Sequence, residues 1–208
     1  MKLSHYIVKR DYGFAPNPFY GVCTLATCKS KLRKRAEVGD WVVGIGSASS
    51  IYKGKIICAM QVDEILTFDQ YWKDSRFQIK KPVMNGSIQQ KYGDNIYHTN
   101  ESGKIEQLDS HHSYENGEPN MHNLNRDTGG EKVLISNKFW YFGKNAVKLP
   151  PNLERLTNVR MNYKNIKEND DKEFIDEFIN WIHQFDSNQL IGYPEKFTSG
   201  FQRYDGTS

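Results

Sequence analysis

Short apolar runs bounded by glycine or charged residues are the first regularity along the chain. The runs at residues 5–8, 41–45 and 56–60 are rich in β-branched and aromatic residues, and two more follow at 133–136 and 139–142. Apolar runs of this length with such punctuation are typical of well-buried strands. The pattern therefore predicts a sheet or a small barrel.

Two helices are predicted in the first half of the chain. Residues 30–38 are charged and end at Gly39-Asp40, which is compatible with a short basic helix followed by a turn into the next strand. Thr67 and Gln70 have the spacing of a capping box, which would open a second short helix and bury its aromatic side chains.

The last predicted helix has the clearest pattern. Asp170 and Glu173 have capping-box spacing. The residues after them form one apolar helical stripe, made of Phe174, Ile175, Phe178, Ile179, Ile182 and Phe185. We expect this helix to lie on the sheet, and the tail after residue 192 to be a loosely packed strap.

Residues 78–131 are polar and show no helix or strand pattern longer than a few residues. A connection of this length is usually functional or disordered. It contains four of the six histidines, namely His98, His111, His112 and His122, which favours a functional loop. We expect it to fold across a pocket and to become ordered on a ligand.

Length and composition limit the class of protein. A chain of 208 residues with 38% hydrophobic residues, 25% charged residues and a mean hydropathy of −0.73 fits one water-soluble domain without a membrane span. The N-terminus has no signal-peptide pattern, so we expect a cytoplasmic protein. The three cysteines are expected to be reduced thiols rather than a disulfide framework.

The charge is unevenly distributed. Residues 1–60 contain ten of the 28 Lys and Arg residues but only three of the 25 acidic residues. Five of the seven residues from 29 to 35 are basic, a density that could neutralise phosphates, with Lys29 and Arg33 as the expected contacts. A solvated basic face is the alternative interpretation.

Residues 10–21 are the first candidate ligand-binding segment. Two prolines and two glycines fix an irregular backbone, and four aromatic rings lie too close together for all to enter one core. Tyr12 and Phe14 could stack on a base, while Asp11 and Asn17 could bind its polar edge. The alternative is a rigid, well-packed loop.

The second candidate segment is residues 39–47. Gly44 and Gly46 lie inside a predicted strand, which implies close approach of another backbone or of a ligand. If a ligand lies there, Trp41 and Ser47 are the expected contacts, and packing alone is the alternative. The spacing does not match a phosphate-binding loop.

The polar loop is the third candidate and the one with catalytic residue types. Asp94, Asp109, His111 and His112 could act as acid/base groups or bind a divalent metal, and His111 is favoured because it follows Asp109 by two residues. Adjacent histidines in an extended segment point to opposite faces, so only one should reach the pocket.

Several alternatives remain open for this loop. Asn95 and Tyr97 are further ligand-binding candidates, and a catalytic Cys/His pair or a merely solvated loop is also compatible with the sequence. The chain has no HExxH or CxxC motif, and no structural zinc site, bound metal or cofactor is expected.

Several of these segments together resemble a known family. The runs at 11–19 and 23–29, with Gly39-Asp40-Trp41 and residues 44–47, are similar to the bacterial and phage family called nucleotide modification associated domain, type 2. Later matches lie at residues 68–72, 93–97, 109–113 and 133–136, so the likeness covers about residues 4–145. The resemblance implies a setting in nucleotide or DNA base modification, without specifying the reaction.

A second likeness concerns the fold. A basic helix that leads through Gly39-Asp40 into a buried strand resembles PUA-like domains, which bind RNA or a flipped base at an aromatic-lined barrel mouth. The chain lacks the Gly-x-Lys-x-x-Glu signature of the ASCH branch, so that branch's catalytic residues are not carried over.

Together these observations predict an α+β protein with a mixed, barrel-like (PUA-like) sheet. Residues 1–150 would form the body, and residues 151–208 a C-terminal helix and tail packed on it. The expected function is binding of a nucleotide, or of a flipped or single-stranded nucleic-acid base, in an aromatic pocket. An enzyme using the Asp and His groups of the polar loop is one alternative. The other is an adaptor that docks an acidic, operon-encoded protein partner in DNA modification or phage defence.

Overall fold

The larger sheet runs through the middle of the protein. A computed structural model describes residues 1–159 and 163–206 of the chain. The strand order is β11-β1-β3-β4-β9-β12, and β10 pairs with β4. These strands are β1 (Lys2–Val8), β3 (Trp41–Gly46), β4 (Lys55–Gln61), β9 (Lys138–Tyr141), β10 (Val147–Lys148), β11 (Lys164–Lys167) and β12 (Gln189–Leu190).

This sheet is mixed and open. The pairs β1–β3 and β9–β12 are parallel, and the other pairs are antiparallel. Its outer strands, β11 and β12, are not paired with each other in the described residues. The α+β class is therefore confirmed, whereas the expected closure into a barrel is not found in the part of the chain that the structure describes.

Packing explains the glycines of β3. A Cβ on Gly44 would lie 2.6 Å from the Cys58 sulfur, and one on Gly46 would lie 2.1 Å from the Tyr52 carbonyl oxygen. Both distances are shorter than Cβ atoms tolerate, so these positions need glycine for close approach of β4 and the turn before it. Of the two alternatives for this segment, the structure supports packing.

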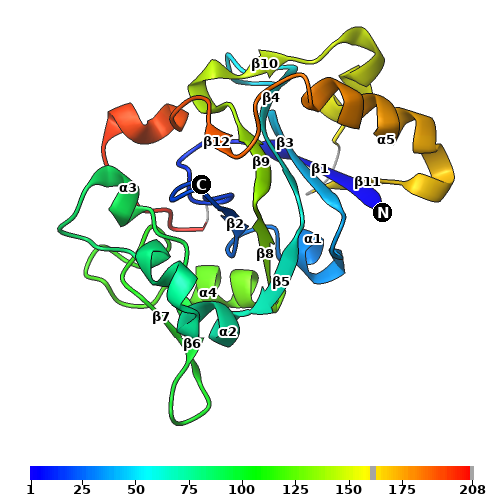
Figure 1. The fold of residues 1–208 in the computed structure, drawn as a ribbon. Helices are drawn as coiled ribbons and strands as arrows, with labels where there is room; N and C mark the ends of the chain where they lie inside the picture. The colour runs from blue at the N-terminus through cyan, green and yellow to red at the C-terminus, as the bar shows by residue number, and fades with distance from the viewer. Residues whose placement is uncertain (160–162, 207–208) are drawn as a thin grey trace.

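Two smaller sheets complete the β structure. One has the order β2-β8-β5, and the other is the hairpin β6–β7, which protrudes from the body (Figure 1). Their strands are β2 (Cys23–Leu25), β5 (Glu64–Thr67), β6 (Tyr97–Thr99), β7 (Ile105–Gln107) and β8 (Lys132–Ser136). The apolar runs that predicted strands thus form β1, β3, β4, β8 and β9.

The helices are distributed on both sides of the sheets (Figure 1). The α-helices are α1 (Ser30–Arg35), α2 (Phe68–Lys73), α3 (Ile88–Lys91), α4 (Met121–Thr128) and α5 (Glu168–Ile182). The 3₁₀ helices are η1 (Ser75–Lys80), η2 (Gly143–Asn145), η3 (Pro151–Thr157) and η4 (Glu195–Ser199). The predicted capping box of α2 is present, because Thr67 and Gln70 exchange side-chain and backbone hydrogen bonds.

Helix α5 covers one face of the larger sheet, as its apolar stripe predicts. Phe174, Ile175, Phe178 and Ile182 are buried in one core cluster with side chains of β1, β3, β4 and β9. Trp41 belongs to this cluster and stacks on Trp140 with ring centroids 5.5 Å apart.

The polar stretch is more regular than the sequence indicates. Residues 78–131 include the end of η1, helix α3, the β6–β7 hairpin and the eight-residue α4. Many of its polar side chains are buried, among them Asp94, Asn95, Ser110, His112, Asn123 and Asp127. His112, Asn123 and Asp127 belong to one hydrogen-bonded network, whereas Asp94 and Asn95 bind elsewhere in the core. Polar residues that hydrogen-bond each other in a core leave no apolar periodicity, and for this reason the elements were missed.

The C-terminal tail is closely held by the rest of the protein. Arg203 donates to the Asp109 carboxylate, the Ser110 carbonyl and the Ser113 hydroxyl, all within 2.7 Å. The Tyr204 amide donates to the His111 carbonyl at 2.7 Å. The expectation of a loosely packed strap is therefore wrong, because these hydrogen bonds fix the tail on the polar network.

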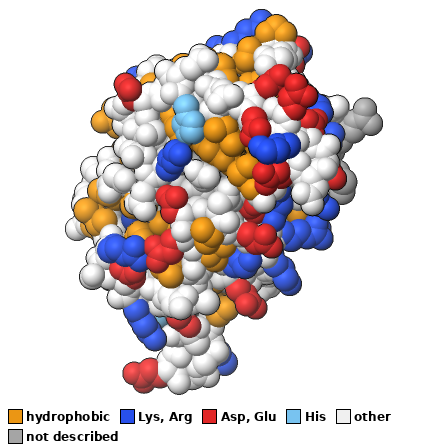
Figure 2. Space-filling view, turned by 45° about the vertical axis from the view of Figure 1, so that its right-hand side comes forward, with side chains coloured by type: hydrophobic (Ala, Val, Ile, Leu, Met, Phe, Trp, Pro, Cys, Tyr) orange, Lys and Arg blue, Asp and Glu red, His pale blue; other side chains and the backbone are white. Residues whose placement is uncertain are grey.

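The face shown in Figure 2 carries Lys and Arg side chains interspersed with Asp and Glu, together with apolar patches. This face has no continuous basic surface. Among the described residues, no helix is both long enough and apolar enough to span a bilayer.

Candidate functional site

A cavity of about 460 Å³ lies beside β1, between the loop after this strand, the start of α1 and the C-terminal tail. Its lining includes five cationic side chains, Lys9, Arg10, Lys29, Lys31 and Arg126. Asp11 is the one carboxylate in the described lining. Aromatic rings from several segments complete the wall, namely Tyr6, Tyr12, Phe14, His111, His112, Tyr141, Tyr163 and Tyr204.

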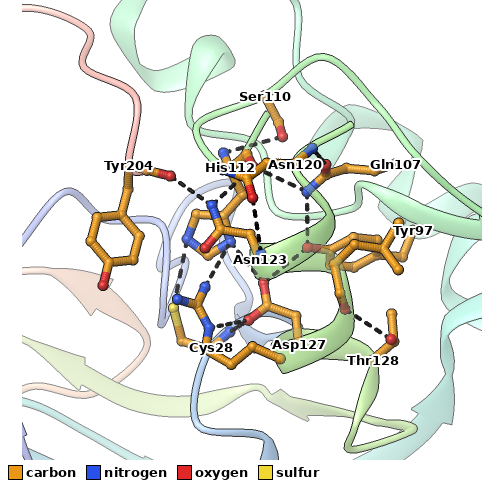
Figure 3. A network of polar contacts seen from close by, with 12 residues as sticks. Cys28, Tyr97, Gln107, Ser110, His112, Asn120, Asn123, Asp127, Thr128 and Tyr204 are labelled. Atoms are coloured by element: carbon orange, nitrogen blue, oxygen red, sulfur yellow. Dashed lines mark hydrogen bonds and ion pairs between the residues drawn. The ribbon is translucent and has the colours of Figure 1, made fainter. Parts of the chain in front are cut away.

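A cysteine, a histidine and an aspartate are arranged in series at one wall of this cavity (Figure 3). The Cys28 sulfur lies 3.7 Å from Nε2 of His112. On the other side of the ring, Nδ1 of His112 donates to Oδ2 of Asp127 at 2.7 Å. Cys28 is half-buried and lines the cavity, whereas Asp127 is completely buried behind it.

The backbone at Cys28 has a conformation that L-residues rarely adopt. Cys28 and Lys29 have φ values of 54° and 39°, in the left-handed region. Two contacts hold this turn: the Cys28 amide donates to Oδ1 of Asp127 at 3.0 Å, and its carbonyl accepts from Nε of Arg33 at 2.9 Å. Strained conformations of this kind persist only where surrounding contacts fix them, and they are enriched at functional sites.

Further hydrogen bonds fix the histidine and the aspartate. The Tyr97 hydroxyl donates to Oδ2 of Asp127 at 3.0 Å, and Nε of Arg126 donates to Oδ1 at 3.0 Å. The His112 carbonyl accepts from the side-chain amides of Gln107 and Asn123. These residues come from β6, β7 and α4, so the polar network positions the imidazole (Figure 3).

The protonation of the two adjacent histidines differs. Burial lowers the pKa of His111 to about 3, so this ring is neutral at pH 7. Burial also acts to lower the pKa of His112, but the Asp127 carboxylate and Cys28 raise it to about 9. Burial disfavours the Asp127 anion, yet the neighbouring His112, Arg126 and Arg33 hold its pKa well below the usual range. The pair is therefore an imidazolium and a carboxylate near pH 7.

Cys28, His112 and Asp127 could also be considered as metal ligands, since one donor atom of each lies within 4.8 Å of the others. However, Nδ1 of His112 is bonded to Asp127, and the other carboxylate oxygen accepts from Arg126. An ion at this place would keep only the sulfur and Nε2 as ligands, fewer than the three or four protein ligands of typical zinc sites. The arrangement fits proton transfer better than metal binding.

Six of the residues predicted from the sequence line the cavity, namely Asp11, Tyr12, Phe14, Lys29, His111 and His112. Tyr12 is half-buried, with its ring centroid 4.6 Å from that of His111. Phe14 is only 3% exposed, and its ring packs edge-on against both histidines, which is a core role. Burial raises the pKa of Asp11, whose carboxylate accepts from the Tyr141 hydroxyl.

Several other predicted residues lie away from the cavity because their polar groups are bonded inside the protein. Asn17 is buried and binds Lys80 and the Tyr92 carbonyl, and Asn95 donates to two backbone carbonyls. Asp94 accepts from the hydroxyls of Thr24 and Tyr71.

The remaining candidates outside the cavity have other structural roles. Trp41 lies in the core under α5, and Ser47 is in a turn where its hydroxyl meets that of Ser49. Tyr97 does not line the cavity, and its hydroxyl donates to the Asp127 carboxylate. Arg33 is completely buried and donates to four backbone carbonyls, of Cys28, Asp127, Gly130 and Lys132. We leave all four out of the ligand-binding surface.

The predicted pairing of Asp109 with His111 is wrong. Asp109 binds Arg203 and Ser113, whereas Nδ1 of His111 donates to the Gln202 carbonyl at 2.6 Å. The two histidine rings stack with centroids 5.3 Å apart, and both line the cavity. The segment is a turn rather than an extended strand, so the alternation expected for its side chains does not apply.

Sequence reasoning gave little weight to Cys28 and none to Asp127 as the partner of a histidine. Cys28 is 84 residues from His112 along the chain, and the Cys28-Lys29 turn has no glycine or asparagine to mark its left-handed backbone. The available signal was the presence of a cysteine, a histidine pair and Arg126-Asp127 in one chain, which allows a Cys/His/Asp arrangement without locating it.

Fold and site together define an α+β protein whose half-open, cationic and aromatic cavity contains a thiol backed by a histidine–carboxylate pair. The chain belongs to the family nucleotide modification associated domain 2, whose model matches residues 1–201. The match includes α5, which lies outside residues 4–145, the segment that carries the resemblance in the sequence. The family's name links the chain in general terms to nucleotide modification. No curated protein and no solved structure matches the chain.

Proposed function

We propose that the protein binds a nucleotide in the cavity beside β1, with the base against the aromatic wall and the phosphate near the start of α1. The single observation that carries this proposal is the lining, in which five Lys and Arg side chains and the His112 imidazolium face one carboxylate among the described residues. Such a lining favours an anionic ligand. The volume lies within the range of roughly 300–1,000 Å³ that is usual for small-molecule sites.

Lys29 and Lys31 are the residues best placed to meet the phosphate. The Lys29 ammonium lies 4.7 Å from the centre of the Tyr6 ring, and burial lowers its pKa. A phosphate beside this ammonium would offset the cost of its burial, since an opposite charge favours the charged form. Lys31 is exposed at the rim of the same cavity.

The base would lie against the aromatic wall that Tyr12, His111 and Tyr204 form. These rings come from the loop after β1, the turn after β7 and the tail, and base stacking on aromatic rings contributes roughly 1–3 kcal/mol. In this proposal the cavity binds the base as the aromatic-lined barrel mouth of PUA-like domains does. The sheet beside it is open in the described residues rather than closed into a barrel. The ligand is a free nucleotide or the flipped nucleotide of a strand.

The test is equilibrium binding of a nucleoside, its 5′-monophosphate and a short single-stranded oligonucleotide at several salt concentrations. We expect the monophosphate or the oligonucleotide to bind and the nucleoside to bind more weakly. Lys29→Gln should reduce phosphate-dependent affinity by about tenfold or more, because a charge-assisted contact is lost. For the oligonucleotide, Lys29→Gln should also reduce the slope of log affinity against log salt concentration by about the amount expected for one phosphate contact.

Lys34→Gln is the matched control. It removes the same charge from α1, the helix that Lys29 precedes, but Lys34 is exposed and does not line the cavity. Equal affinities of the two variants would contradict the proposed phosphate site. The monophosphate and oligonucleotide arms separate a free nucleotide from a nucleic-acid strand.

A further inference from the structure

We propose that Cys28 is a catalytic nucleophile, with His112 as its proton-transfer partner and Asp127 as the residue that positions the imidazole. The substrate class is a nucleotide-like anion with a carbonyl carbon joined to a nitrogen or oxygen leaving group. The substrate class rests on the proposed function, whereas the reactivity of the thiol does not.

The geometry is that of an activated nucleophile. The sulfur is 3.7 Å from Nε2 of His112, and the opposite ring nitrogen donates to Asp127, which fixes the tautomer and the orientation. A nucleophile, a base and an orienting carboxylate in this order recur on unrelated folds that catalyse acyl transfer. Lys29 and Arg126 add positive charge to the same cavity, where a carbonyl oxygen would become negative during attack.

The other two cysteines show that Cys28 is distinct. Cys23 and Cys58 are 1% and 3% exposed, and burial raises the pKa of the Cys58 thiol to about 12. Cys58 also lines the cavity, but its neighbour is the Tyr6 hydroxyl rather than a histidine. A thiol that is half-buried, faces the cavity and contacts an imidazole is found only at Cys28 in the described residues.

The expected reaction is hydrolysis with a thioester intermediate. The sulfur attacks as the thiolate of an ion pair with the His112 imidazolium, which already holds the proton on Nε2, and a bond forms between sulfur and the carbonyl carbon as the carbonyl oxygen becomes negative. The tetrahedral species then loses its leaving group as the bond from carbon to nitrogen or oxygen breaks, and His112 gives the proton to that group. Water then attacks the thioester and gives a proton to Nε2 of His112, the carbon–sulfur bond breaks, and the carboxylic acid leaves, which restores the thiolate and the imidazolium. One water is consumed, and nothing is oxidised or reduced.

The test begins with iodoacetamide alkylation of the full chain, followed by mass spectrometry with peptide mapping. In the native protein, Cys28 should be modified first. Its rate should rise much less than hundredfold between pH 6 and pH 8, whereas an isolated thiol gains about tenfold per pH unit below its pKa. This measurement uses the unaltered protein, so it does not depend on whether a variant folds.

Variants then assign the role of the histidine. His112→Asn should slow alkylation at pH 6 by about tenfold or more, whereas Cys28→Ser should abolish it. His122→Gln is the matched control, since His122 is an exposed histidine of α4 that does not line the cavity, and it should change the rate by less than about twofold.

An activated ester, p-nitrophenyl acetate, probes the acyl chemistry directly. We expect an acetyl group on Cys28 and release of nitrophenolate, with both lost in Cys28→Ser. An ordinary tenfold-per-unit rise in the alkylation rate of the native protein, or acetylation elsewhere only, would overturn the nucleophile. If native mass spectrometry shows one bound metal per chain, and Cys28 is alkylated only after a chelator removes this metal, the proposed nucleophile would be a metal ligand instead.

Protection separates this proposal from the nucleotide site. A nucleoside monophosphate should slow alkylation of Cys28 in proportion to its occupancy of the cavity. A reactive Cys28 that no nucleotide protects would support the nucleophile and overturn the nucleotide-like substrate. Nucleotide binding to a protein whose Cys28 is unreactive would support the nucleotide site and overturn the nucleophile.

Discussion

Arg33 lies in the middle of a basic run, but its guanidinium group is buried among backbone carbonyls. It donates to the carbonyls of Cys28, Gly130 and Lys132 at 2.6–2.9 Å, and to that of Asp127. The planar fork of five donors is suited to such a cluster, which lysine could not satisfy. Arg33 therefore joins the start of α1 to the end of α4, and it helps to position both Cys28 and Asp127.

Three buried histidines, His5, His111 and His112, should give the stability of the protein a maximum near pH 6.5, with His5 and His111 acting on the acid side. Burial lowers the pKa of His5 to about 4, so below 6.5 the unfolded chain takes up a proton that the folded chain does not. Its contribution is therefore lost as the pH falls from 6.5 toward 4. His112 has a raised pKa of about 9, so the stability that it contributes is complete below 6.5 and is lost as the pH rises toward 9.

Chemical denaturation between pH 4 and pH 9 checks this prediction. His5→Gln should reduce the slope of the acid side, to which His111 also contributes, and His112→Gln should flatten the alkaline side, so each variant is the control for the other. Profiles in which either substitution changes both sides equally would contradict the assignment.

At the scale of elements, α5 begins differently from the prediction. The sequence suggested a capping box between Asp170 and Glu173, but Asp171 is the residue with non-helical backbone angles, φ −163° and ψ 73°. Its Oδ1 accepts from the Phe174 amide at 3.1 Å, and Oδ2 accepts from Arg155 at 2.6 Å. The cap is thus one residue later, at the point where the apolar stripe starts to pack on the sheet.

Substitution of the two aspartates distinguishes the caps. Asp171→Ala should lower the melting temperature, because the Phe174 amide loses its acceptor and Arg155 loses its partner. Asp170→Ala should leave it almost unchanged, since Asp170 is exposed and is not the capping residue. Thermal unfolding followed by circular dichroism measures both. An equal effect of the two substitutions on the melting temperature would contradict the assignment of the cap to Asp171.

At the scale of the whole molecule, the C-terminal tail completes the cavity that the N-terminal third begins. The Glu195 amide donates to the Asp11 carboxylate, and the Lys196 amide to its carbonyl. Further along, Gln202 and Tyr204 hydrogen-bond to His111. The site therefore depends on segments almost 200 residues apart.

Removal of the chain after Phe201 tests this dependence. The truncation removes the acceptor of His111 and the Arg203 contacts to the turn at residues 109–113, so amides of this turn should exchange hydrogen faster. Nucleotide affinity should fall with it, while exchange in β3 and β4 should stay unchanged. Hydrogen exchange by mass spectrometry measures all of these regions in one experiment. Unchanged exchange in the turn would show that the tail does not hold it.

The local pattern of the sequence determined the longer strands of the larger sheet, strand β8 and three helices. Strands β1, β3, β4, β8 and β9 follow from apolar runs, and α2 and α5 follow from capping signals and apolar spacing. Such features are predictable because they depend on residues a few positions apart. Composition and charge also predict a ligand site at the aromatic loop and Lys29, and residues 10–16 of this loop and Lys29 line the cavity.

Only the tertiary structure decided which polar side chains face the cavity and which are buried. His112 meets Cys28 from 84 residues away and Asp127 from 15 residues away, and nothing local in the sequence identifies these partners. The same holds for Arg33, whose carbonyl acceptors lie 94–99 residues further along the chain, apart from that of Cys28. A buried polar group is stable only where distant segments supply its hydrogen bonds, so its role is fixed by the packing of the whole chain.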